Sequence, residues 1–185
     1  IYTVTNTLSL HDALPIFVAK NGDDAWPGTR SEPKRTIQAG IDTAFLQGKR
    51  DVYVASGVYR EAVRLAVGVG VYGGYSADFR VRDMARYESA VLAPAPVVGL
   101  PGAVNGIGIQ GGLPGTTVLD GFTVFAHEER RPGMSSYGVY LHECDVTVRV
   151  SNNILVGGSG GPGGRGIDGR DGDDGMGGTP GTDAT

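Results

Sequence analysis

The stretch Asp51–Ser76 (DVYVASGVYREAVRLAVGVGVYGGYS) constrains the fold more than any other part of this sequence. Its β-branched and aromatic residues form three short runs, separated by glycines, at positions 52–54, 58–67 and 69–72. Val63, Leu65 and Val67 alternate with other residues, which is the period of a half-buried strand. The corners between the runs are too short for a crossover helix, so we expect a β-solenoid and take this stretch as its first full turn.

Later segments repeat the pattern. The sequence predicts a second strand face at Thr117–Phe125 and the start of a third turn at Gly138–Leu141. We expect Asp120 to be a corner residue between strands and not a catalytic acid. Asn152 and Asn153 fit a corner with left-handed backbone, where asparagines can form hydrogen-bonded ladders between turns.

One amphipathic helix is predicted at Thr36–Phe45, with Thr36 as its N-cap and Gly48 as the stop signal. Its expected apolar stripe consists of Ile37, Ile41, Ala44 and Phe45. A lone helix of this length needs a packing partner. We expect it to cover the end of the solenoid, whose strand edges would otherwise be unpaired. On the first turn, Arg60, Glu61 and Arg64 are expected to be outward-facing surface residues.

Composition excludes several classes of protein. The chain has 185 residues and a net charge of −4, which gives no basic footprint for nucleic acid. No apolar run is long enough for a membrane span. The single cysteine, Cys144, excludes an internal disulfide; we expect it to be a small buried or half-buried residue beside a surface residue, His142.

The chain is expected to be a fragment with four segments. Residues 7–16 (TLSLHDALPI) look like one reading frame of a sequencing adapter, so we interpret 1–16 as a cloning or assembly scar. A signal-peptide remnant or an ordinary strand is the alternative. An N-terminal cap is expected at 17–50, the first coils at 51–156, and a glycine-rich insert or linker at 157–185.

Glycine recurs at every third position of the last segment, from Gly157 to Gly181. An extended insert similar to polyproline II, leaving a solenoid corner, or a disordered linker explains this period best. A trimeric collagen-like helix ranks second, because Pro162 and Pro180 are the only prolines of the segment. Its aspartates could bind calcium only weakly.

The titratable residues do not form a convincing catalytic constellation in the sequence. His127, Glu128 and Glu129 are the densest cluster, and imidazole beside carboxylates could do acid–base work, but we favour a solvated loop. Asp23 and Asp24 could bind calcium, although turn formation is the favoured role. No catalytic residue is assigned, and the metal and carbohydrate sites stay open. The other catalytic candidates, Asp120, Asp145 and Arg149, are scattered along the sequence. A separate set could contact a carbohydrate acid, although a solvated loop is favoured: Arg80, Arg82 and Arg86 with Tyr87.

Residues 17–158 resemble the right-handed parallel β-helix, or pectin-lyase-like, superfamily, and in particular bacterial extracellular β-helix domains. The resemblance rests on residues 18–24, 27–29, 33, 36–44 and 52–61. It implies an all-β parallel β-helix with one capping helix, located outside the cell or on its surface. It implies a non-catalytic scaffold or adhesion-type domain with a polysaccharide or surface glycan as partner. The alternative is a polysaccharide lyase or glycoside hydrolase whose active site lies in further coils.

Overall fold

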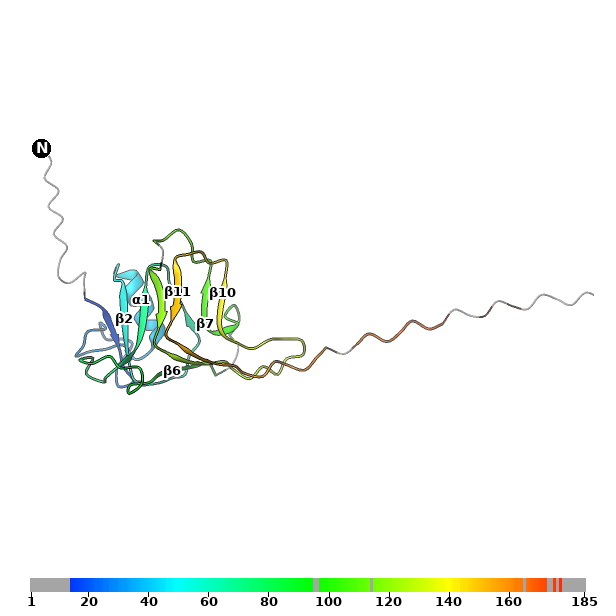
Figure 1. Ribbon diagram of the computed structural model, residues 1–185, viewed down its shortest axis with the longest axis horizontal. Coiled ribbons are helices and arrows are strands. Elements are labelled where there is room, and N and C mark those ends of the chain that lie inside the picture. Colours follow the sequence, from blue (N-terminus) through cyan, green and yellow to red (C-terminus); the bar gives the residue numbers. More distant parts are fainter. Residues whose placement is uncertain are drawn as a thin grey trace, which may run out of the picture.

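A computed structural model describes residues 14–94, 97–113, 115–164, 166–172, 175 and 177 of the chain. It contains one helix, α1 (Ile37–Leu46), among short strands (Figure 1). The strands are β1 (Ile16–Val18), β2 (Asp51–Ala55), β3 (Gly57–Tyr59), β4 (Val63–Arg64), β5 (Gly70–Tyr75), β6 (Ser89–Leu92), β7 (Gly102–Ile107), β8 (Thr117–Asp120), β9 (Thr123–Phe125), β10 (Tyr137–His142), β11 (Val148–Ser151) and β12 (Ile154–Val156).

The strands form three parallel sheets that wind into a β-solenoid of about four turns. The five-stranded sheet has the order β1-β2-β5-β8-β11, the four-stranded sheet β12-β9-β6-β3, and the three-stranded sheet β10-β7-β4. The first three turns each contribute one strand to each sheet: β2, β3 and β4 make the first turn, β5, β6 and β7 the second, and β8, β9 and β10 the third. Among the described residues, the fourth turn contributes β11 and β12. The predicted all-β solenoid is therefore confirmed.

The predicted boundaries of the turns were wrong. The first turn ends with β4, and β5 opens the second turn, because Val71 lies in register with Val52. In the same way β10 closes the third turn, since its Val139 pairs with Val104. Alternation reveals a strand but not the turn to which it belongs, because insertions give each turn a different length.

Inward-facing side chains of successive turns stack into columns that form the core. Ile16, Val52, Val71 and Leu119 make one such column, and all four are almost completely buried. Burying an aliphatic side chain of this size contributes about 1.5–3 kcal/mol. On the fourth turn Val150 continues the column but is 37% exposed, because none of the described residues packs over it.

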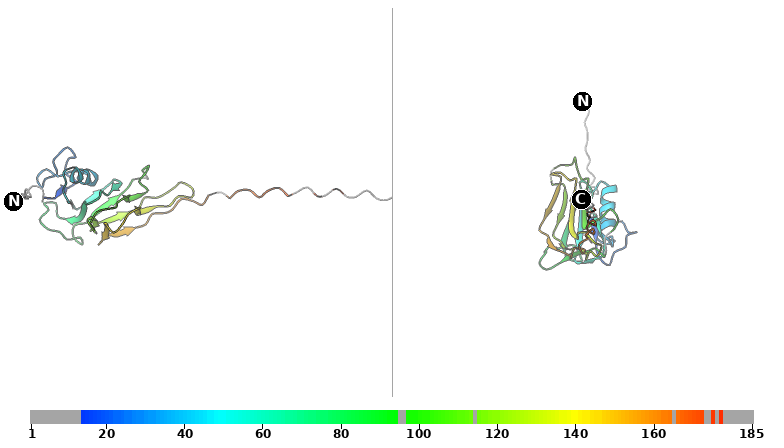
Figure 2. Two further views of the ribbon diagram at one scale, coloured as in Figure 1. Left: turned by 90° about the horizontal axis from the view of Figure 1, so that it is seen from above. Right: turned by 90° about the vertical axis from the view of Figure 1, so that its right-hand side faces the viewer.

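Helix α1 covers the inward side of β1 and β2 at the N-terminal end of the solenoid (Figure 2). Thr36 is the predicted N-cap, and its side chain accepts a hydrogen bond from the Ala39 amide. The prediction for Phe45 was wrong: it is 53% exposed. Gly40 takes its place on the buried face, because a Cβ there would lie only 2.5 Å from Val18 and 3.1 Å from Val52.

Glu61 also differs from its expected role as a surface residue. Its carboxylate is half-buried and accepts hydrogen bonds of 2.9 Å from the amides of Ile37 and Gln38, in the first turn of α1. These amides have no partner within a helix. Glu61 therefore ties α1 to the first solenoid turn.

The corner between the five-stranded and four-stranded sheets behaves as predicted for the asparagine pair. Asn152 has a positive φ of 54°, and Gly121 occupies the matching corner one turn earlier with φ 80°. The Asn153 side chain donates to the Leu119 carbonyl at 2.9 Å and accepts from the Phe122 amide at 2.9 Å. An amide side chain thus links the third and fourth turns, although by bonds to backbone.

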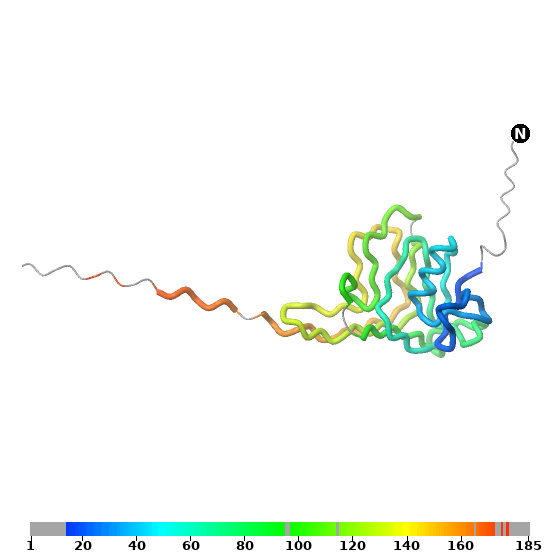
Figure 3. The backbone as a smooth tube through the Cα atoms, turned by 180° about the vertical axis from the view of Figure 1, so that it is seen from behind, coloured from blue at the N-terminus to red at the C-terminus, as the bar shows by residue number. Residues whose placement is uncertain are grey.

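Residues 126–136, between β9 and β10, project from the solenoid as an extended loop that we call the arm. The start of the glycine-rich segment, residues 157–162, runs beside the arm (Figures 1 and 3). The amides of Ala126 and Glu129 donate to the carbonyls of Val156 and Ser159, and the Gly161 amide donates to Met134. The first two bonds are three residues apart in both segments, so the backbone pairing of the arm with the glycine-rich segment continues beyond the β-ladder with a period of three residues.

Candidate functional site

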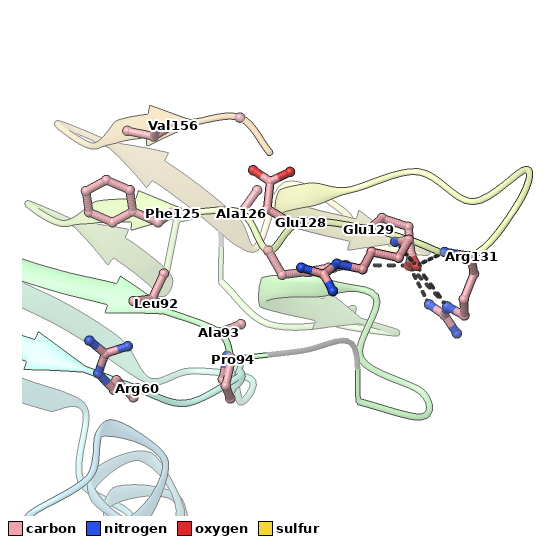
Figure 4. A pocket seen from close by; sticks show the side chains of 13 residues that line it. Arg60, Leu92, Ala93, Pro94, Phe125, Ala126, Glu128, Glu129, Arg131 and Val156 are labelled. Carbon is pink, nitrogen blue, oxygen red and sulfur yellow. Dashed lines mark hydrogen bonds and ion pairs between the residues drawn. The ribbon is translucent and has the colours of Figure 1, made fainter. Parts of the chain in front are cut away.

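An open groove of about 780 Å³ lies on the outer side of the four-stranded sheet, where the arm leaves it (Figure 4). Its floor repeats one outward position from turn to turn. Leu92 of β6, Phe125 of β9 and Val156 of β12 are in register, and Arg60 follows β3 at the first turn. Parallel stacking therefore converts single residues, far apart in sequence, into one continuous apolar strip.

A tight ion pair within the arm stabilises its local conformation beside the groove. Arg131 donates from Nη2 to Glu129 Oε2 at 2.6 Å and from Nε to Oε1 at 3.0 Å, and the amides of Arg130 and Arg131 donate to Oε1 at 2.8 Å (Figure 4). The hydrogen bonds from the Arg131 side chain and backbone lower the pKa of Glu129 to about 2. Glu129 is therefore an ionised structural carboxylate with little capacity left for proton transfer.

His127 lies in the wall of the groove, and the prediction of a solvated loop was wrong for His127 and Glu129, whereas Glu128 is exposed as expected. The side chain of His127 is only 3% exposed, and that of Glu129 only 2%. Neither ring nitrogen of His127 has a hydrogen-bond partner among the described residues. Glu129 Oε2 is 3.6 Å from Nε2, which is too long for a hydrogen bond. The arm was expected to be solvated because its sequence is polar, but the glycine-rich segment packs along its backbone.

Three charged side chains remain at the rim of the groove. Arg60 and Arg130 are exposed, and their guanidinium groups make no hydrogen bond or ion pair within the described part of the chain. Glu128 accepts a hydrogen bond from the Ser159 amide at 3.2 Å. With Glu129 paired to Arg131, the rim of the groove keeps two arginines and one exposed carboxylate above an apolar floor.

The outer side of the five-stranded sheet carries a second group of polar and aromatic residues. Tyr53 stacks on Tyr75 with ring centroids 4.6 Å apart, and Arg82 lies 5.5 Å from the Tyr72 ring and 5.7 Å from that of Tyr75. Arg82 also forms an ion pair with Asp120. The loop 76–88 thus lies back against this sheet, and Arg82 is not free to contact a carbohydrate acid.

Asp120 ends β8 beside the corner, and three side chains from distant parts of the chain hold its carboxylate. Besides Arg82, Ser151 and Asn152 each donate to its Oδ2 at 2.7 Å. Burial opposes ionisation, but these hydrogen bonds outweigh it, and the net effect is a lowered pKa for Asp120. The residue links the loop 76–88 to the third and fourth turns.

Asp51 lies at the edge of the same five-stranded sheet, and unlike Asp120 its carboxylate has no partner among the described residues. It is half-buried at the start of β2, and its carboxylate makes no hydrogen bond with any described residue. Burial raises its pKa, against the opposing charge of Arg50. Burial and then the Asp51 charge raise the pKa of Tyr72. Arg149 lies in the same register column, across Gly70 and Val118.

The remaining predicted candidates have local structural roles. Asp24 accepts hydrogen bonds from the amides of Arg35 and Thr36 and from the Thr36 hydroxyl, each at 2.9 Å. These bonds outweigh the effect of burial and lower its pKa. Asp23 accepts from the Ala25 amide at 2.9 Å, and Asp145 from the Thr147 amide at 2.8 Å. Asp23 and Asp145 therefore form local turns, whereas Asp24 ties its loop to the N-terminus of α1.

Other candidates lie apart from the groove. Arg80 pairs with Asp78 at 3.5 Å, and Arg86 lies 5.4 Å from the Tyr87 ring. Cys144 is half-buried and contacts the Gly106 carbonyl, while His142 is exposed, as expected for both. Among the residues that the structure describes, there is no group of three or more histidines, cysteines or acidic residues that could hold a metal ion.

Sequence reasoning missed the residues that build the groove. Leu92, Phe125 and Val156 each end a strand of the four-stranded sheet, and Arg60 follows another. The detectable signal was an apolar residue two positions after Ala90, Thr123 and Ile154. Using it requires the turns to be aligned first, and the turn boundaries were the part of the prediction that failed.

Comparisons with protein-family models, curated proteins and solved structures found no match to the chain. The architecture and the groove are therefore the basis for assigning a function. No helix in the part of the chain that the structure describes is long and apolar enough to cross a membrane.

Proposed function

We propose that this chain is part of a non-catalytic scaffold of the extracellular or cell-surface type, which holds a glycan on the outside of a parallel β-solenoid. We place it in the pectin-lyase-like superfamily. The three-sheet solenoid, the helix over its first turn and the motifs in residues 17–158 support that assignment. A stack of parallel turns presents matching side chains at regular intervals, which suits an extended polymer.

The state of the buried carboxylates is the observation that carries the non-catalytic role. Asp120 and Glu129 are the two acids that are most buried, and both already accept several hydrogen bonds from neighbouring groups. A general acid must hold a proton near the working pH, whereas these side chains have lowered pKa values. Their chemistry fits structural anchoring.

Binding and turnover should be measured on the same samples. Immobilised protein is exposed to polygalacturonate, alginate and neutral dextran, and the soluble phase is assayed for new reducing ends or unsaturated products. The proposal expects retention of at least one polymer without any product. Sustained product formation would refute the non-catalytic role, and failure to retain any polymer would refute glycan binding.

A carbohydrate-active enzyme is the second candidate, and Asp51 is the observation that favours it. Its carboxylate has a raised pKa and no hydrogen-bond partner within the described residues, and it lies close enough to Tyr72 to raise that residue's pKa. Such perturbed groups concentrate at functional sites. If turnover is detected, Asp51→Asn should abolish it, whereas full activity in that variant would exclude this face as its source.

A further inference from the structure

We propose that two copies of this chain associate end to end, with the fourth turns of their solenoids joined across a two-fold axis that passes through Val150 of β11. The contact surface is the end formed by β10, β11 and β12, and the partner is a second copy of the same chain. This inference is independent of glycan binding and goes beyond the proposed function, because it concerns how the scaffold assembles.

The inward columns of the solenoid end in aliphatic side chains that are only partly covered. Val150 ends the column described above and is 37% exposed. Leu155 of β12 lies over Val124, which is completely buried, yet is itself 54% exposed. Val139 of β10 lies over the buried Val104 and is half-buried. The coil therefore ends in an apolar surface like a cut through its own core, and covering such a surface is favourable.

The strands at this end also have a free edge of backbone groups. The amides of Thr117 and Gly121 donate to the carbonyls of Thr147 and Ser151, so the backbone groups of these last two residues point toward the third turn. Backbone groups alternate in direction along a strand, so the Val150 amide and carbonyl point the other way, where no described strand lies. A free edge is a template for pairing with another chain, and β10, β11 and β12 contain no proline or lysine that would prevent it.

The opposite end of the solenoid is closed, which leaves no matching surface for a head-to-tail contact. The outer edge of β1 is paired with the loop before α1: the Lys34 amide donates to the Phe17 carbonyl and the Ala19 amide to the Lys34 carbonyl, both at 2.9 Å. Helix α1 then covers the inward side of β1 and β2, at the end opposite to β11 and β12 (Figure 2). The open end therefore pairs with its own copy, and an interface between identical surfaces has two-fold symmetry.

The rise of the coil makes this end complementary to itself. Along the coil β10 lies one sheet before β11, and β12 lies one sheet after it, so the end surface is stepped, with β12 farthest along the axis and β10 least far. A two-fold axis through the middle of β11 places each β12 opposite the partner's β10. The high step of one copy then meets the low step of the other, and all three strand pairs keep the usual spacing of about 4.8 Å.

The charge of Arg149 selects the register of the central strand pair. Antiparallel strands place inward residues opposite inward residues, so Val150 faces either the partner's Val150 or the partner's Val148. The second register would set the two Arg149 side chains directly opposite each other, which is unfavourable for like charges. The first register sets Arg149 opposite the partner's Ser151, and the two Val150 residues exchange both of their backbone hydrogen bonds.

The size of the end suits a stable dimer. The surface is formed by residues 137–156, which matches the lower limit of the roughly 20–30 residues a side found in standard interfaces. Leu141 and Val146 are also exposed there and extend its apolar part.

The test measures the molar mass of the purified chain by sedimentation velocity and light scattering at rising protein concentration. We expect a reversible equilibrium between single chains of 19.2 kDa and particles of twice that mass. Val150→Lys should raise the dissociation constant at least about 100-fold, because the axis brings two unpaired charges into the contact. Val58→Lys is the matched control: this valine is 49% exposed on the first turn, away from the contact, so its variant should dimerise like the parent.

Hydrogen exchange at the Val150 amide reports which surface is covered. Its protection should rise with protein concentration in the parent and in Val58→Lys, and should stay low in Val150→Lys. Amides of β2 and β5 should remain protected in all three chains, which shows that each variant is folded. If Val150→Lys loses that protection, Leu155→Lys provides the same test on β12 and should weaken the dimer in the same way.

Four results would overturn the proposal. A parent chain that stays monomeric up to about 1 mM would refute the dimer. Particles that keep growing beyond a dimer would refute the closed two-fold contact. Protection of the Val150 amide in a monomer would show that another segment of the same chain covers this end. Association that folded Val150→Lys and Leu155→Lys variants leave unchanged would place the contact on a different surface.

Discussion

Gly161 is the position at which the contact between the arm and the glycine-rich segment can be tested most directly. A Cβ added there would overlap the carbonyl group of Arg131, which is backbone and cannot rotate away. Gly161→Ala should therefore separate residues 157–162 from the arm. Three backbone hydrogen bonds would be lost: Glu129 to Ser159 at 3.0 Å, Gly133 to Pro162 at 2.8 Å and Gly161 to Met134 at 2.9 Å.

The expected effect follows from the number of bonds. At a net value of about 1 kcal/mol for each, separation costs roughly 3 kcal/mol, so removing the contact should raise the open population roughly 100-fold. Hydrogen exchange at the amides of Glu129, Gly133 and Gly161, followed by mass spectrometry, measures this directly. Amides in β2 and β5 should keep their protection, because the solenoid itself is unchanged.

Gly163→Ala provides the matched control. It makes the same chemical change two residues later, where an added Cβ meets nothing within 4 Å. Exchange in this variant should equal that of the parent chain. If Gly161→Ala leaves the three amides as protected as Gly163→Ala does, the described packing of the segment on the arm is wrong.

Three further substitutions test the contacts that hold the solenoid together. Asp120→Asn should lower the free energy of unfolding in urea by about 1–3 kcal/mol at pH 7. The pKa of Asp120 is lowered in the folded state, so its contribution to stability is present above the ordinary aspartate pKa of about 3.9 and is lost on acidification. The unfolding free energies of the parent and the variant should therefore converge near pH 2. Glu61→Ala leaves the amides of Ile37 and Gln38 without an acceptor and should lower the free energy of thermal unfolding by about 1–3 kcal/mol. Glu61→Gln retains one acceptor oxygen, so its effect should be smaller. Equal destabilisation by both variants would contradict the capping role. Gly40→Val should destabilise the chain by about 1–3 kcal/mol through overpacking, despite the poor helix propensity of glycine, and unchanged stability would show that α1 does not lie this close to β1.

Local sequence signals were sufficient for the elements and corners of this fold. The Thr36 cap and the left-handed Asn152 depend on residues close in sequence or on an intrinsic backbone preference, and the structure confirms both. Phe45 shows the limit of periodicity: it fits the helical stripe, yet Gly40 occupies the buried face because the strands beneath approach too closely for a larger residue.

The candidate site depended on information that a single pass along the sequence does not contain. Leu92 and Phe125 become neighbours only after the register between turns is known, and insertions of unequal length hide that register. The backbone of His127 lies against a segment some thirty residues later, whose glycines permit the close approach. Gly158 shows this directly, since a Cβ there would overlap the His127 carbonyl group. Neither the register between turns nor the packing of this later segment can be inferred from the polar composition of the arm.

The excursions after β6 and β9 and the glycine-rich segment after β12 all leave the solenoid at equivalent strand ends, where the four-stranded sheet stops. Chain can be added at this corner without altering the pitch of the coil or the columns inside it, and each doubling of a flexible loop costs only about 0.6 kcal/mol in closure entropy. The side of the groove can therefore diversify in length and charge almost independently of the core. For protein engineering, this corner is the natural place to graft a new recognition loop onto the solenoid.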